Sequence, residues 1–189
     1  MFLGLCAVLA LALVPLTGGS YRRLSELRLR WLPLAAAALL VQVVVISVWP
    51  TMPHGAAVAG HVLSYLMLAV VVWVNRAVPG MVVIGLGAAL NAVAITANDG
   101  TLPASRWALQ HAGIHARDGF NNSGLLAHPH LSWLGDVMVT PSWLPFRNML
   151  SVGDLVLLLG VVILVIGSSR RAGTASDLPR VREAAGAVA

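Results

Sequence analysis

Two aspartates near the end of the chain are the side chains best suited to acid–base chemistry. Asp136 follows Gly135, and Asp154 stands three residues after Ser151, at the start of a long apolar run. When two carboxyl groups lie close together they share a proton, so that one can activate water while the other donates a proton, as aspartic hydrolysis requires. Asp136 and Asp154 are therefore the candidate catalytic residues.

The same aspartates also have structural interpretations. Ser151 and Asp154 have the spacing of a capping box, in which two side chains satisfy the free N–H groups at the start of a helix. The Asp154 carboxylate would then stabilise the positive end of that helix. Asp136 would cap a turn. Which interpretation holds depends on whether the two carboxyl groups meet.

A second set of polar side chains lies at or near one end of the apolar segments. We predict a ligand-binding set comprising Gln42, His61, Asn91, Asn98, Asp99 and Asn148. Polar groups inside a membrane pair with one another or serve a function. Two interpretations therefore stay open: hydrogen bonds between helices, or a polar-floored pocket that opens toward the outer side.

Four histidines between residues 98 and 150 raise the question of a metal site. His111 and His115 have the i,i+4 spacing of ligands on one helix face, and His128 and His130 could add a second pair. Nothing in the sequence brings the pairs together, and there is no HExxH motif. A haem centred on His61 lacks a second intramembrane histidine opposite it. We therefore predict no metal and no cofactor.

The segments that must position these residues are strongly apolar. The 189-residue chain is 58% hydrophobic and 10% charged, with a mean hydropathy of +0.85, which indicates a membrane protein. Five apolar runs, at residues 2–16, 31–49, 56–74, 77–97 and 152–167, approach the length of about 17–25 residues that crosses a bilayer. The predicted fold is an all-α integral membrane protein with five transmembrane helices and an external cap at 98–150, between helices four and five. Within the cap, a helix is expected at 104–117, with Gly119 ending it.

Arginine orients the chain, which has no lysine. Nine of the twelve arginines lie between runs one and two, between runs three and four, or after run five: Arg22, Arg23, Arg28, Arg30, Arg76, Arg170, Arg171, Arg180 and Arg182. The positive-inside rule assigns these segments to the cytoplasm, with the N-terminus outside and the C-terminus inside. Residues 1–167 form the membrane domain, and 168–189 a disordered cytoplasmic tail. We expect membrane lipid, not nucleic acid, as the partner of this basic surface.

Several short motifs resemble a known family. They are Gly18-Gly19-Ser20 with Arg28-Leu29-Arg30 and Gln42, the turn Asn98-Asp99-Gly100-Thr101-Leu102-Pro103, Gly135-Asp136-Val137, Pro145-Phe146-Arg147-Asn148 and Ser151-Val152-Gly153-Asp154. Together they resemble a bacterial family of small five-helix membrane proteins known only as a domain of unknown function. The likeness covers most of residues 1–167 and implies the five-helix fold, but no activity. The arginine-only, Ala/Val/Leu-rich composition also suggests a bacterial plasma membrane.

The stretch from Asn148 to Asp154 and the apolar run after it are similar in layout to signal peptidase II, a membrane aspartic protease. That resemblance implies a hydrolase that uses Asp136 and Asp154, although the motif spacing differs from that family's. Our leading expectation is a non-catalytic module whose outer pocket holds an amphipathic ligand or a partner transmembrane helix. The alternative is the aspartyl hydrolase.

Overall fold

Helices dominate the computed structural model, which describes residues 2–49, 51–113, 123–144 and 147–170. The helices are α1 (Phe2–Ala12), α2 (Tyr21–Ser25), α3 (Leu32–Val43), α4 (His54–Val74), α5 (Met81–Thr96), α6 (Arg106–Ala112) and α7 (Val152–Arg170), with short helical turns at Pro15–Thr17, Val44–Val48 and Ser132–Leu134. The strands are β1 (Leu102–Pro103), β2 (Ser123–Gly124), β3 (Asp136–Val139) and β4 (Met149–Ser151).

The five predicted apolar runs correspond to α1, α3, α4, α5 and α7. The helices α4 and α7 are long and apolar enough to cross a membrane, whereas α3 and α5 are apolar but shorter. The first run divides into α1 and a turn at Pro15–Thr17, and the second ends in a π-helical turn at Val44–Val48. Residues 168–170, which we expected to open the tail, continue α7. The rest of the predicted tail lies outside the described residues.

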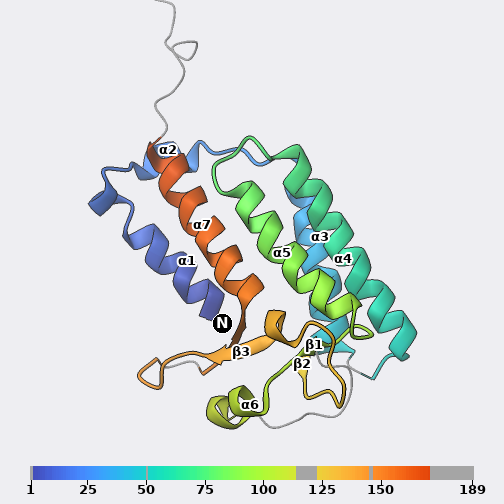
Figure 1. Cartoon of the computed structure of the whole chain (residues 1–189). Coiled ribbons are helices and arrows are strands. Elements are labelled where there is room, and N and C mark those ends of the chain that lie inside the picture. The colour runs from blue at the N-terminus through green and yellow to red at the C-terminus, as the bar shows by residue number, and fades with distance from the viewer. Residues whose placement is uncertain (1, 50, 114–122, 145–146, 171–189) are drawn as a thin grey trace, which may run out of the picture.

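The long helices pack in an order that differs from their order in the chain. The last helix, α7, lies between α1 and α5, while α4 packs on the other side of α5 and α3 packs on α4 (Figure 1). The most extensive of these contacts joins α5 to α7. It brings the first turn of α7 beside the end of α5 that carries Asn91.

Glycines make the close approach of α5 and α7 possible. A Cβ at Gly80 would overlap the carbonyl oxygen of Gly160, and a Cβ at Gly87 would overlap the backbone of Gly153 and Leu157. The paired positions run in opposite directions along the two helices, which are therefore antiparallel. Gly80, which caps the start of α5, and Gly87 are seven residues apart, as are Gly153 and Gly160 on α7, so the contact repeats on one face after two turns.

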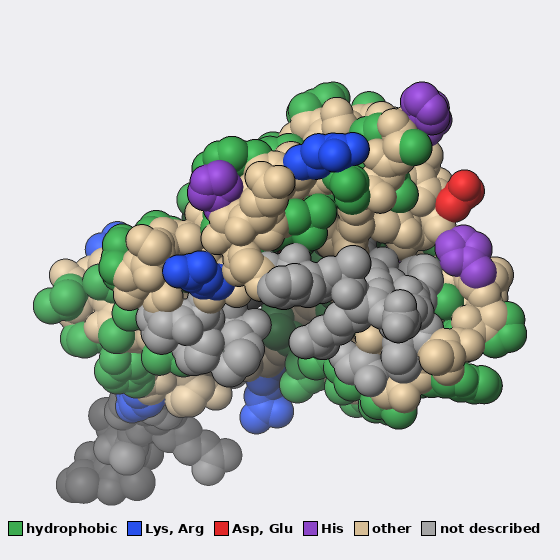
Figure 2. Space-filling view, turned by 90° about the horizontal axis from the view of Figure 1, so that it is seen from below, with side chains coloured by type: hydrophobic (Ala, Val, Ile, Leu, Met, Phe, Trp, Pro, Cys, Tyr) green, Lys and Arg blue, Asp and Glu red, His purple; other side chains and the backbone are tan. Residues whose placement is uncertain are grey.

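The cap between α5 and α7 contains strands that we did not predict. β1 pairs with β2 in parallel, and β3 pairs with β4 in antiparallel register, with Asp136 opposite Ser151. The cap helix α6 is shorter than expected and ends at Gly113, whose φ of 65° is left-handed; the expected stop at Gly119 lies outside the described residues. Seen from the cap end, histidine and arginine side chains are spread among hydrophobic ones (Figure 2).

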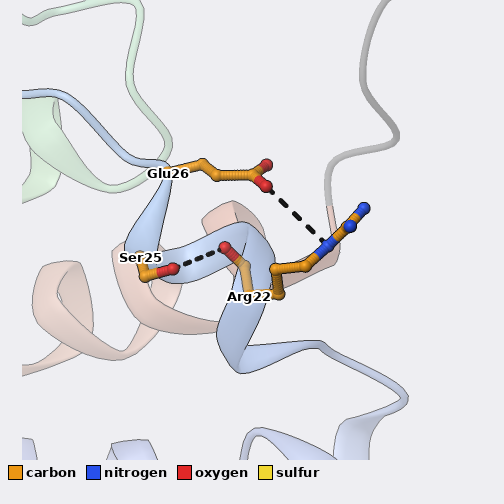
Figure 3. A network of polar contacts seen from close by, with 3 residues as sticks. All are labelled: Arg22, Ser25 and Glu26. Carbon is orange, nitrogen blue, oxygen red and sulfur yellow. Dashed lines mark hydrogen bonds and ion pairs between the residues drawn. The ribbon is translucent and has the colours of Figure 1, made fainter. Parts of the chain in front are cut away.

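The opposite end of the molecule is basic. Arg22 and Glu26 form an exposed ion pair at 3.8 Å, and the Ser25 hydroxyl donates to the Arg22 carbonyl at 2.8 Å (Figure 3). The backbone N–H of Ser20 donates to the carbonyl of Ser169 at 3.0 Å, which fastens this segment to the end of α7. The bond between Ser20 and Ser169 holds the start of α2 against α7, at the end of the helices far from the cap (Figure 1).

Candidate functional site

Asn91, Ser151 and Asp154 form one hydrogen-bonded network where α5 meets the start of α7. The Asn91 amide Nδ2 donates to Asp154 Oδ1 at 2.9 Å, and the Ser151 hydroxyl donates to Asn91 Oδ1 at 2.8 Å. Gly153 makes room for this amide, since a Cβ there would overlap Asn91 Oδ1. Asn91 is 60 positions from Ser151 and 63 from Asp154, so only the packing of α5 on α7 brings it to them.

The predicted capping box is present within this network. The Asp154 N–H donates to Ser151 Oγ at 3.0 Å, and the Ser151 N–H donates to Asp154 Oδ2 at 3.0 Å. Both carboxylate oxygens of Asp154 therefore accept a hydrogen bond, one from its own helix start and one from α5. A carboxylate in this position also stabilises the positive end of the α7 dipole.

Asp136 lies next to this network, because Ser151 is its partner in the β3–β4 pair. Its side chain is buried, and its backbone carbonyl accepts a hydrogen bond from the Ser105 N–H at 3.0 Å. Burial raises the pKa of Asp136 to about 6, the neighbouring Ser123 hydroxyl acts in the opposite direction, and the Asp154 carboxylate adds to the rise. Burial is thus the dominant cause.

Asn98 connects the end of α5 to the cap. Its Nδ2 donates to the carbonyls of Ala94, at 2.7 Å, and His130, at 2.8 Å, while its Oδ1 accepts the His130 N–H at 2.8 Å. The next residue, Asp99, is exposed and has a left-handed φ of 51°. Asn98 is therefore a structural clamp, whereas Asp99 presents its carboxylate at the surface.

The remaining predicted ligand residues are dispersed. His61 is buried in α4 and meets the Tyr65 ring edge-on, with ring centroids 5.2 Å apart. Gln42 is half-buried on α3. The backbone N–H of Asn148 donates to Thr140 Oγ1 at 2.9 Å, in the cap. Of the six predicted ligand residues, the structure joins Asn91 to the aspartate network and leaves Asp99 at the surface.

An open hollow of about 530 Å³ lies on the cap-side half of α4, beside Asp99. Its walls are one face of that helix together with the turn after α5: His54, Gly55, Val58, Ala59, Val62, Leu63, Leu66 and Asp99. The helical residues follow the three- and four-residue spacing of a single apolar stripe. That spacing is visible in the sequence, but the stripe was interpreted only as part of a membrane span.

Sequence reasoning also missed a second asparagine clamp, at the far end of α4. Asn75 Oδ1 accepts the Arg30 N–H at 2.8 Å, and its Nδ2 donates to the carbonyls of Arg30, at 2.8 Å, and Val71, at 2.7 Å. This arrangement repeats that of Asn98. An asparagine just after an apolar helix is the available sequence signal, although it does not name the partner segment.

No group of three or more His, Cys, Asp or Glu side chains that could hold a metal is found within the described ranges. His111 stacks on Trp107 with ring centroids 4.5 Å apart, and its Nδ1 lies 2.8 Å from the Trp107 carbonyl. His115, its expected partner, lies outside those ranges.

A family model, described as Family of unknown function (DUF5317), matches residues 26–166. The chain belongs to this family. The DUF5317 match covers α3 to α6 and all but the last four residues of α7, including the whole cap and the Asn91–Ser151–Asp154 network, and it confirms the resemblance to a family without a known activity. No match to a curated protein or to a solved structure was found, and nothing links this DUF5317 chain to signal peptidase II.

Proposed function

We propose that this DUF5317 protein is a multi-pass protein of the bacterial plasma membrane, with α1, α3, α4, α5 and α7 embedded and the cap outside. The proposal is supported by the distribution of charge. Of the described arginines, two lie in the cap and six lie at the opposite end, at positions 22, 23, 28, 30, 76 and 170. The positive-inside rule assigns the arginine-rich end to the cytoplasm.

The exposed side chains of the helices support the same placement. Leu40 on α3, Leu66 on α4 and Leu159 on α7 are all more than half exposed. Full burial of a leucine side chain contributes about 1.5–3 kcal/mol, and in water each of these positions would forgo more than half of it. Trp31 and Trp73 are exposed at the basic end, and Trp49 near the cap, as in the aromatic belts of membrane proteins.

The function that this geometry favours is a binding module for an amphipathic molecule with a cationic head. The observation that carries the proposal is the hollow on α4, where Val58, Val62 and Leu63 offer an apolar wall and Asp99 offers a carboxylate at the outer end. From His54 to Leu66 the wall is about 18 Å long at 1.5 Å per residue. That length is close to one leaflet of a hydrocarbon core about 30 Å thick.

A hydrolase that uses Asp136 and Asp154 remains the second candidate. The unequal environments of the two carboxyl groups favour it, because Asp136 is buried while Asp154 is held by two donors. A paired acid and base of this kind is typical of carboxylate catalysis. Neither aspartate, however, lines the α4 hollow. We therefore favour the binding module over the hydrolase.

Photolabelling would test the binding module. The protein would be placed in phosphatidylcholine nanodiscs and labelled with a twelve-carbon amine that carries a diazirine, or with a sulfate of equal length. We expect the amine to label residues 58–66 more strongly than the sulfate does. Asp99→Asn should lower amine labelling by up to about fivefold, since an exposed ion pair contributes up to about 1 kcal/mol.

A matched pair of variants separates the hollow from the rest of α4. Ala59 lines the hollow, whereas Ala56, also exposed, does not. Ala59→Phe should abolish the labelling and Ala56→Phe should retain it. Equal labelling by amine and sulfate, unchanged in Asp99→Asn and Ala59→Phe, would refute the binding module.

A further inference from the structure

A second hollow, of about 410 Å³, lies between α4 and α5 on the basic side of the molecule. Small residues of α5 form its floor, including Gly85, Ala89 and Ala92, while Tyr65 and Trp73 of α4 stand at its sides. A Cβ at Gly85 would come within 2.6 Å of the Val72 side chain, so this glycine lets the helices approach closely at the floor. The volume lies within the range of small-molecule sites, about 300–1,000 Å³.

The two ends of this hollow differ in chemistry. At one end lies Arg76, whose guanidinium sits 4.5 Å from the centre of the Trp73 ring and donates to the Trp73 carbonyl at 2.8 Å. Toward the other end, Tyr65 lies at the middle of α4 and Ala92 lies in the last part of α5, and the surfaces along the way are aliphatic. A guanidinium has five N–H donors, so the bond to Trp73 leaves donors for a ligand.

A second arginine is held at the same end. Asn75, which directly precedes Arg76 in the chain, fixes the backbone of Arg30 through two 2.8 Å hydrogen bonds. Trp31 follows Arg30 and is 56% exposed, and Trp73 is 68% exposed. Two arginines and two exposed tryptophans thus gather where the helices would leave the hydrocarbon, which is the composition of a site for anionic headgroups.

The length of the hollow matches one leaflet. Tyr65 and Arg76 are eleven residues apart, so the α4 wall extends about 16 Å at 1.5 Å per residue. Half of a hydrocarbon core about 30 Å thick is about 15 Å. A transmembrane partner helix would continue past Tyr65 into the outer half, whereas an acyl chain would end near that level.

We infer that this hollow binds one acyl chain of an anionic phospholipid from the cytoplasmic leaflet, with the phosphate held by Arg76 and Arg30. The inference rests on the proposed membrane placement, and although Leu66 lines both hollows, it does not depend on the amphipathic ligand proposed for the outer one. The small floor residues and Tyr65 would select the chain by shape. The arginines would select the headgroup by charge.

Native mass spectrometry of the full chain, released from nanodiscs of equal phosphatidylglycerol and phosphatidylcholine, would test this site. We expect one retained lipid, enriched in phosphatidylglycerol. Arg76→Gln should lower this headgroup preference about fivefold, as expected for one arginine near an anionic surface. Arg106→Gln, in the cap, should leave the preference unchanged. Ala89→Phe should abolish retention of both lipids, because the new ring fills the hollow.

The controls keep the outcomes distinct. Leu86→Phe adds the same ring to an exposed position of α5 that does not line the hollow, and it should retain the lipid. Wild-type preference in Arg76→Gln, or undiminished retention in Ala89→Phe, would overturn the lipid site while leaving the membrane placement intact. Failure of the wild-type chain to enter nanodiscs at all would overturn both. Circular dichroism would verify that each variant keeps its helical content.

Discussion

Ser151 is the residue through which the two predicted catalytic aspartates are connected. Its backbone pairs with Asp136 across two strands, and its N–H and hydroxyl bind Asp154 and Asn91. The capping interpretation of Asp154 is therefore satisfied in full by local contacts. A catalytic role would have to use a carboxylate that already holds a helix start and an interhelical amide, so we give the network a structural role first.

Asp136 should make the stability of the protein depend on pH. Its pKa is raised from the ordinary 3.8 to about 6, so the native state binds this proton more tightly than the unfolded chain does. The contribution of this proton to the free energy of unfolding is present in full below pH 4 and is lost as the pH rises through 6. A shift of this size corresponds to about 3 kcal/mol. Thermal unfolding in detergent from pH 4 to 7 should show the decline.

Two substitutions check this assignment. Asp136→Asn removes the titrating group, so its melting temperature should vary much less over that interval. Asp99→Asn removes an exposed carboxyl group elsewhere in the cap and should keep the decline. If the melting temperature of Asp136→Asn varied with pH as much as that of the wild type, the buried Asp136 carboxyl group could not be the cause of the decline.

At the scale of elements, the contact between α5 and α7 depends on glycine. Gly80 and Gly87 face Gly160 and Gly153, and the resulting close approach is what lets Asn91 reach the first turn of α7. Small residues at helix contacts are the usual means of tight packing in membranes, where lipid competes equally well for apolar side chains. The polar network and the glycine contact are therefore parts of one interface.

Gly160→Val should destabilise the protein by about 3 kcal/mol, because overpacking a tight contact forces the backbones apart. A side chain at this position would meet the Ile84 N–H and the Gly80 carbonyl. Thermal unfolding in detergent would measure the loss. Gly55→Ala is the matched control: no heavy atom lies within 4 Å of a Cβ there, and alanine favours a helix by about 1 kcal/mol over glycine. Equal stability of Gly160→Val and wild type would contradict this packing.

At the scale of the whole molecule, the cap and the basic end lie at opposite ends of the helices (Figure 1). The cap is not a loose connector: Ala104, Ala108, Ala112 and Met149 form a buried cluster within it. A second cluster of Ile95, Leu102 and Leu134 fastens it to the end of α5. This rigid attachment would keep Asp99 in place beside the outer hollow.

The proposed orientation predicts which cysteines react in intact cells. In a Cys6→Ser background, Ser142→Cys in the cap should react with a membrane-impermeant maleimide from outside. Ser25→Cys, at the basic end, should react only after permeabilisation; both serines are exposed. The reverse pattern would invert the topology, and equal reaction of both from outside would contradict the membrane placement.

The sequence by itself determined the features that depend on neighbours along the chain. The apolar runs follow from composition, and the distinction between the basic end and the cap end of the helices follows from the placement of arginine. The Ser151–Asp154 capping box follows from a three-residue spacing. The tertiary structure alone decided that α7 lies between α1 and α5, that Asn91 is the partner of Asp154, and that Asp136 pairs with Ser151. Asn91 and Asp154 are 63 positions apart, and the contact between α1 and α7 joins opposite ends of the described chain. No helical period encodes these contacts, because the partner of a buried polar group depends on which helices become neighbours and how closely glycine lets them approach.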